Sequence, residues 1–267
     1  MSGVKLQVKH AFGINANVKH NLTFCDEHLL AYVCGHQVVI FNTESRDQNF
    51  IALTSLPGFQ SQGITAIGCA IRRKWIAVAE KADPVAVVSF YDTHALRRRK
   101  QLIHPELDSK EVKCIAFSDD NRFCLCLGGG PGWNLVLWNV EKTPKVMSMV
   151  KLSPGDETPF HQVSFCSYEN TTLVAIGKGA IRAFRIGDGQ FRPINLSFRR
   201  DSANFISHCW LYDEEKLIVS TEAGEILMFE NLEYRAQLFP TGDTITHSLI
   251  HFLIPSHTFS NRHSHSL

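Results

Sequence analysis

The stretch "NLVLWNV", Asn134–Val140, decides how the whole chain is interpreted. It is a short apolar run that follows the glycine-rich "GGGPG" at residues 128–132, a pattern typical of a buried strand after a turn. Its tryptophan, Trp138, is either a lone core aromatic or one member of a repeated set. A lone aromatic would favour a single compact domain of the enzyme type, whereas a repeated set would indicate a repeat scaffold.

Similar strand-like stretches recur at regular intervals along the chain, and each has an aromatic residue near its end. We name these residues the anchors: Phe41, Phe90, Trp138, Phe184 and Phe229. Successive anchors are separated by 49, 48, 46 and 45 residues. This period is close to the roughly 40–50 residues of a four-stranded propeller blade. Trp138 is therefore interpreted as one of a set, with each anchor expected to be largely buried between blades.

Each interval also divides in the same way. A first strand ending in a polar turn, as in "CIAFSDDN", precedes a short apolar strand such as "RFCLCL". A turn then leads into the anchor strand, and a more polar strand such as "RRRKQLI" follows. No helical period competes. The sequence predicts an all-β fold, a β-propeller of about five four-stranded blades.

The repeats are degenerate relatives of Trp-Asp (WD) repeats. None of the anchors is followed by aspartate, because the next residues are Asn42, Tyr91, Asn139, Arg185 and Glu230. The Gly35-His36 pair falls in the wrong turn for the Gly-His pair of such repeats. The period therefore carries more weight than any single motif.

Composition argues against several classes of partner. The 27 basic and 26 acidic residues nearly cancel, so no bulk charge favours nucleic acid. No apolar run is long enough for a transmembrane span or a signal sequence, and we expect no membrane insertion. The eight cysteines include no Cys-x-x-Cys pair, which favours buried thiols in a reducing compartment.

No catalytic, cofactor or metal site is predicted, and the chain is interpreted as a non-enzyme. The glycine-rich segment at residues 128–132 lacks the Lys-Ser/Thr and the helix of a phosphate-binding loop. Cys124 and Cys126 share one face of a strand, but two thiols do not make a zinc site. We interpret them as core residues.

Two short basic runs of the second repeat form a possible partner-binding rim. One lies on its outermost strand and the other in a hairpin turn, and we name the set the basic rim: Arg97, Arg98, Arg99, Lys100, Arg72, Arg73 and Lys74. The rim is either a solvated edge that discourages sheet pairing or a docking patch for acidic partners. In the second case, its outer run contributes to docking rather than to folding.

The end of the chain has a different composition. We expect residues 1–241 to form the propeller and residues 242–267, which contain five histidines, to form a flexible tail. A metal site through His263 and His265 is the less favoured interpretation. The change in composition is interpreted as the mark of a shortened isoform or an alternative end.

Several stretches, in order, resemble the cilia- and flagella-associated protein 57 family of WD-repeat proteins. They span roughly residues 8–239 and include "HAFGINANV", "CDEHLLAY", "QSQG", "AIRRKWIAVAE", "NLVLW", "KVMSMV", "FHQVSF", "HCWLYDEEKLIV" and "TEAGEILMFE". The resemblance implies paired propellers followed by coiled coils, of which only the first blades are present here. It also implies a non-enzymatic scaffold of motile cilia that supports inner dynein arms or their regulatory complexes.

From this resemblance we expect a location in the axoneme of the cilium or flagellum, the cytoplasm and the cytoskeleton. The implied partners are inner dynein arm or regulatory complex subunits and tubulin. The alternative is a general cytoplasmic propeller adaptor or assembly factor with no tie to the axoneme. Five blades either form an incomplete ring, with uncovered faces that promote self-association, or close a small ring.

Overall fold

The computed structural model describes residues 8–53, 57–153, 158–211 and 215–238. These residues form strands and two short 3₁₀ turns, η1 (Ile71–Arg73) and η2 (Pro105–Leu107), and contain no α-helix. No helix in the described segments could therefore cross a membrane. The predicted histidine-rich tail, residues 242–267, lies outside the described residues.

Consecutive groups of four strands form five separate sheets, which we number as blades 1 to 5. Blade 1 contains β1 (Leu22–Phe24), β2 (Leu29–Cys34), β3 (Gln37–Asn42) and β4 (Gln48–Ile51). Blade 2 contains β5 (Gln60–Ala70), β6 (Trp75–Asp83), β7 (Val87–Asp92) and β8 (Arg98–Ile103). Blade 3 contains β9 (Val112–Phe117), β10 (Phe123–Gly128), β11 (Asn134–Asn139) and β12 (Lys145–Lys151). Blade 4 contains β13 (Phe160–Phe165), β14 (Thr172–Gly177), β15 (Ala180–Gly187) and β16 (Gln190–Ile194). Blade 5 contains β17 (Phe205–Trp210), β18 (Lys216–Thr221), β19 (Ile226–Glu230) and β20 (Glu233–Leu238).

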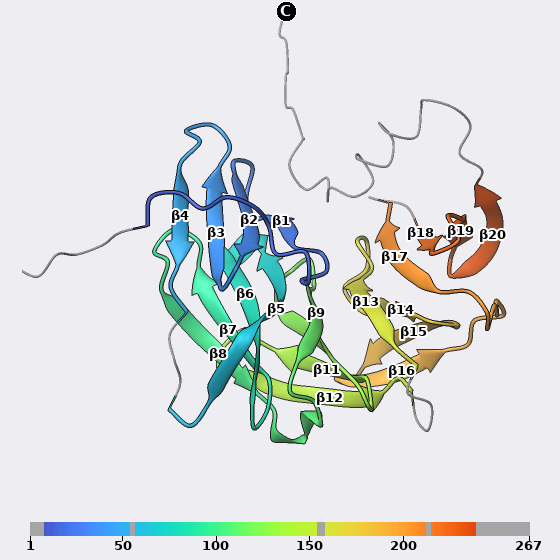
Figure 1. Cartoon of the computed structure of the whole chain (residues 1–267). Coiled ribbons are helices and arrows are strands. Elements are labelled where there is room, and N and C mark those ends of the chain that lie inside the picture. The colour runs from blue at the N-terminus through green and yellow to red at the C-terminus, as the bar shows by residue number, and fades with distance from the viewer. Residues whose placement is uncertain (1–7, 54–56, 154–157, 212–214, 239–267) are drawn as a thin grey trace, which may run out of the picture.

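Every blade is an antiparallel meander in which each strand pairs with the next one in sequence. Figure 1 shows the sheets arranged in an arc about a common centre, with the first strand of each blade innermost and the fourth outermost. This arrangement confirms the predicted all-β fold of four-stranded blades and its repeat period.

The core lies between the sheets because side chains alternate along each strand and cover both faces of a blade. Buried apolar clusters fill the four gaps between consecutive blades. For example, Ile76 and Val78 of β6 pack toward blade 1, whereas Ala77 and Ala79 pack toward blade 3. Each blade therefore has a back face toward the preceding blade and a forward face toward the next.

The arc is open between its two ends. Within the segments that the structure describes, no buried apolar cluster joins blade 5 to blade 1. The forward face of blade 5 contains Ile226, Met228 and the exposed Leu238, and the back face of blade 1 contains the exposed Leu22. The two ends therefore present apolar side chains that no blade of the described chain covers.

Candidate interaction surfaces

Trp138, Phe184 and Phe229 occupy one defined position, the back face at the end of the third strand. Trp138 pairs with Cys124 and packs in the cluster between blades 2 and 3. Phe184 pairs with Leu173 and packs toward blade 3. Phe229 pairs with Leu217 and packs toward blade 4. All three aromatic side chains are buried in the core between their own blade and the preceding one.

The prediction for blade 2 is wrong by one residue. Phe90 is fully buried, but it packs on the forward face, where its ring contacts Phe117 of β9 at a centroid distance of 5.4 Å. Tyr91 packs on the back face toward blade 1. The pairing of the third and fourth strands shifts register between Phe90 and Tyr91, as it does between Leu137 and Trp138. Tyr91 is therefore the equivalent of Trp138.

The anchor of blade 1 also differs from the expectation of burial. Phe41 has the equivalent position, paired with Leu30, but its side chain is only partly buried. The reason is that no other blade among the described residues packs on the back face of blade 1. Gln48 beside it bonds the Tyr32 hydroxyl at 3.1 Å and the Ala11 carbonyl at 3.2 Å, so the segment before β1 runs along this face.

The corrected register restores part of the WD pattern. Tyr91 is followed by Asp92, whose Oδ1 accepts hydrogen bonds from the backbone N–H groups of His94 (3.0 Å) and Ala95 (2.8 Å). The bond from Ala95 is the main reason that the pKa of Asp92 lies below its ordinary value, and Arg99 adds to the effect. The sequence interpretation that aspartate follows none of the anchors is therefore wrong for blade 2, where Asp92 follows Tyr91.

Asparagine performs the same task in two other blades. Asn42 Oδ1 accepts from the N–H groups of Glu44 and Ser45, each at 2.9 Å, and Asn139 Oδ1 accepts from Glu141 N–H at 3.0 Å. An Asp or Asn side chain that bonds the backbone two residues on closes a tight turn. Blades 1 to 3 thus share an aromatic–Asp/Asn pair that closes the turn into the outer strand.

Part of the basic rim is not free for a partner, because it joins blade 2 to blade 3. Lys100 Nζ donates to the carbonyls of Val140 (2.7 Å), Glu141 (3.3 Å) and Lys142 in the β11–β12 turn. Arg73 donates to the Glu141 carbonyl at 3.0 Å, and Arg72 forms an ion pair with Asp119. The expectation that the outer run contributes to docking alone is therefore wrong for Lys100.

The ring of Trp75 lies beneath two of these cations. Arg73 Cζ and Lys100 Nζ lie 5.2 and 5.0 Å from its centroid, within the range of cation–π contacts. Burial lowers the pKa of Lys100, and nearby Arg73 lowers it further. The residues form a structural cluster at the blade 2–blade 3 boundary.

The remaining members of the basic rim lie at its surface. Arg97 and Lys74 are exposed, Arg98 is partly buried, and Arg99 forms an ion pair with Asp92 at 3.0 Å. Arg97, Arg99 and Lys74 therefore remain as the exposed part of the rim that an acidic partner could reach.

Sequence reasoning missed a polar cluster near the centre of the arc. Lys19, in the segment before β1, lies 3.4 Å from His161 Nδ1 on β13, and His161 Nε2 lies 2.9 Å from Asn204 Oδ1. His208 on β17 is buried, and its Nε2 lies 2.6 Å from Ser164 Oγ. Desolvation lowers the pKa of His208 to about 3, with a smaller contribution from His20. No sequence motif indicated this cluster, because its members come from three separate blades.

Neither of the two segments weighed for metal or phosphate chemistry shows a ligand set. Gly128 ends β10 and residues 129–133 connect it to β11, and the free thiols of Cys124 and Cys126 are buried on β10. Across the described ranges, no group of three or more His, Cys, Asp or Glu side chains could hold a metal ion.

Similarity to known proteins extends over most of the chain. The chain is 31% identical over 237 residues to cilia- and flagella-associated protein 57 of Mus musculus, covering 88% of this chain and 18% of the mouse protein. The resemblance to the cilia- and flagella-associated protein 57 family is confirmed. Protein 57 A of Tetrahymena thermophila is 25% identical over 84% of this chain and 21% of its own length.

WD repeat-containing protein 90 of Mus musculus is 26% identical over 66% of this chain and 9% of its own length, in agreement with a WD-repeat chain. No protein-family model matches. The chain spans less than a quarter of the length of each of these relatives. The names of the protein 57 relatives agree with the predicted location in the cilium or flagellum.

Proposed function

We propose that this chain is a non-enzymatic protein-interaction scaffold of motile cilia, which supports the assembly of inner dynein arms or axonemal regulatory complexes. The observation that carries the proposal is the similarity to cilia- and flagella-associated protein 57 over 88% of the chain. A series of blades around a common centre offers many exposed turns and strand edges on a rigid support. Such repeat surfaces are suited to binding several proteins at once.

The accessible part of the basic rim gives the proposal a surface. Arg97 and Arg99 are exposed at the outer edge of blade 2, and their charges favour an acidic partner such as a tubulin tail or an acidic subunit of a dynein complex. We assign residues 1–241 to the scaffold and residues 242–267 to its tail.

The proposal is tested with the tagged 267-residue chain expressed in ciliated cells, followed by isolation and salt extraction of axonemes. We expect the chain in the axonemal fraction and its release as salt rises, because screening weakens exposed charge contacts. The variant Arg97→Glu should be released at lower salt than the wild-type chain. A chain that remains in the cytoplasm would support the alternative of a general propeller adaptor.

A further inference from the structure

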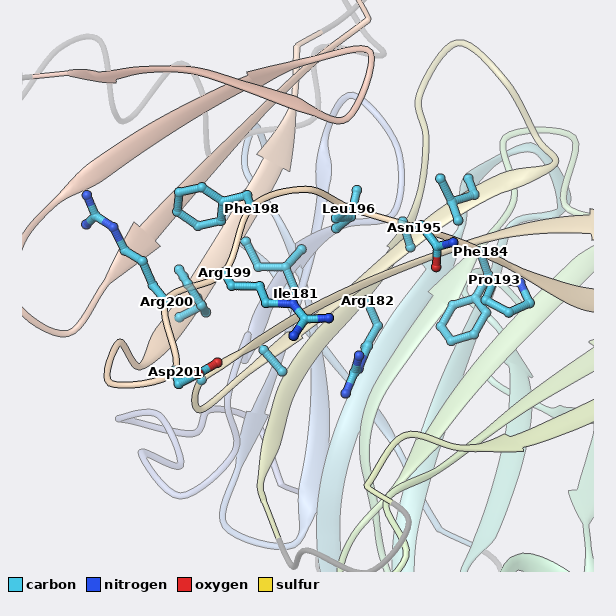
Figure 2. Close-up of a pocket in the computed structure, with 15 residues that line it drawn as sticks. Ile181, Arg182, Phe184, Pro193, Asn195, Leu196, Phe198, Arg199, Arg200 and Asp201 are labelled. Carbon is cyan, nitrogen blue, oxygen red and sulfur yellow. The ribbon is translucent and has the colours of Figure 1, made fainter.

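A cavity of about 290 Å³ lies between the outer half of blade 4 and the segment that leads to blade 5. Figure 2 shows its two sides: β15 and β16 carry Ile181, Arg182 and Pro193, and the connecting segment carries Leu196, Phe198 and Arg199. The volume falls just below the range of about 300–1,000 Å³ for small-molecule sites. It suits one or two side chains of a peptide better than a cofactor.

The cavity exists because the ladder of blade 4 ends early. β15 begins at Ala180, but its pairing with β16 ends at Ala183 and Ile194. Toward the start of β15, the next backbone hydrogen bond on the side of β16 runs from Gly179 N–H to the Ala203 carbonyl, at 2.6 Å. Residues 180–182 of β15 therefore have a strand neighbour on one side only.

The alternation of the strand shows which backbone groups face the cavity. Gly179 N–H points toward the connecting segment, whereas Ile186 N–H bonds Thr171 on the opposite side of β15. Backbone groups of successive strand residues point in opposite directions, so those of Ile181, five residues from Ile186, point away from β14 and toward the side of β16 and the connecting segment. Its N–H and C=O consequently face the cavity, where an extended peptide could pair with them as an added strand.

The far wall of the cavity is fixed to blade 5. The Phe198 ring lies 5.1 Å from that of Phe229 and 4.9 Å from that of Tyr234, measured between centroids. Arg200 forms two hydrogen bonds of 2.9 Å with the carboxylate of Glu225, which holds the same segment. The wall is therefore held in place before any ligand binds, which lowers the entropic cost of binding.

The charge of the rim of the cavity is positive. Arg182 and Arg199 are exposed, and neither forms an ion pair with a carboxylate in the part of the chain that the structure describes. Arg200 is neutralised by Glu225, and Asp201 is the one acidic residue in the lining. The cavity combines apolar side chains, such as Ile181 and Leu196, with the polar groups of Arg182 and Arg199. This combination is complementary to an apolar side chain flanked by carboxylates.

We propose that this cavity binds an extended acidic segment of a partner protein. One apolar side chain enters between Ile181 and Leu196, the flanking carboxylates pair with Arg182 and Arg199, and the peptide backbone bonds Ile181. The inference deepens the proposed scaffold function by naming a class of partner, and its failure would leave the basic rim and the ciliary role intact.

The test uses the 267-residue chain and three fluorescein-labelled ten-residue peptides, with binding followed by fluorescence anisotropy. The first peptide has leucine between Asp and Glu residues, the second replaces leucine with serine, and the third replaces the acidic residues with lysine. We expect a Kd of about 1–100 µM for the first peptide alone, in the range of short segments that lose much conformational entropy on binding.

Variants then locate the site. Arg182→Glu and Arg199→Glu should each weaken binding of the first peptide roughly tenfold, because attraction is replaced by repulsion. The matched control Arg97→Glu makes the same charge change at the basic rim and should leave the affinity unchanged. Circular dichroism confirms that each variant is folded.

Three results would overturn the proposal: no binding of the first peptide below 1 mM, equal binding of the serine or lysine peptide, or equal effects of Arg199→Glu and Arg97→Glu. An equal effect at Arg97 would place binding on the basic rim. In that case the axonemal extraction experiment would still decide the proposed function independently.

Discussion

Two phenylalanines at equivalent positions allow a matched test of the blade register. Phe41 and Phe229 both lie on the back face at the end of the third strand, but Phe229 is 1% exposed against blade 4 and Phe41 is only partly buried. The substitutions Phe41→Ala and Phe229→Ala remove the same atoms. Any difference in their cost therefore reports the presence or absence of a covering blade.

The expected magnitudes follow from burial. Truncation of Phe229 removes contacts with Phe198 and Tyr234 and leaves a cavity, so it should cost about 3–5 kcal/mol. Truncation of Phe41 loses only part of the transfer free energy, because water can occupy the vacated space, and should cost about 1–2 kcal/mol.

The assay is urea unfolding followed by circular dichroism, with the free energy of unfolding obtained by linear extrapolation. If Phe229→Ala prevents folding, the milder pair Phe41→Leu and Phe229→Leu gives the same comparison with smaller losses. Equal costs at the two positions would show that the back face of blade 1 is covered. A loss under about 1 kcal/mol for Phe229→Ala would show that the residue is not buried between blades.

Further expected outcomes concern the blade boundaries and the central cluster. Lys100→Met should cost about 1–3 kcal/mol in urea unfolding because it leaves the partly buried Val140 carbonyl without its donor, and Arg97→Met should have almost no effect. Gly177→Ala should destabilise by about 1–3 kcal/mol, since a Cβ there would lie 2.2 Å from the Pro159 carbonyl oxygen; a neutral result would contradict the packing of β13 on β14. The pKa of His208 is about 3 in the folded chain and about 6.5 when unfolded, so only the unfolded chain gains this proton between those values. Stability should therefore fall as pH decreases below 6.5, by about 2 kcal/mol at pH 5 from this residue, and His208→Asn should reduce the loss measured between pH 7 and pH 5.

The fold could be predicted from the sequence because the period of the blades survives the loss of their motifs. One aromatic at the end of each third strand is enough to reveal it, as Trp138 and Phe184 show. The exact register could not be predicted where two aromatics are adjacent. Phe90 and Tyr91 differ only in which face of the strand they occupy, and the bulge that sets this choice depends on pairing with the outer strand.

The surfaces were less predictable than the fold, because they depend on contacts between blades. A run of cations has the same appearance in sequence whether its side chains face water or bond a neighbouring loop, as Lys100 does. The cavity beside Ile181 results from the early end of β16 and the path of the next segment. Neither feature corresponds to a local pattern of residues.

The described blades form an open arc, and each of its ends carries apolar side chains that no blade of the described chain covers. Size-exclusion chromatography with light scattering of the 267-residue chain tests this arrangement most directly. Exposed apolar faces promote association, so we expect species larger than the 30.1 kDa monomer, increasing with protein concentration. A sharp monomer peak of 30.1 kDa at all concentrations, with one cooperative thermal transition, would contradict the open arc and indicate a closed ring.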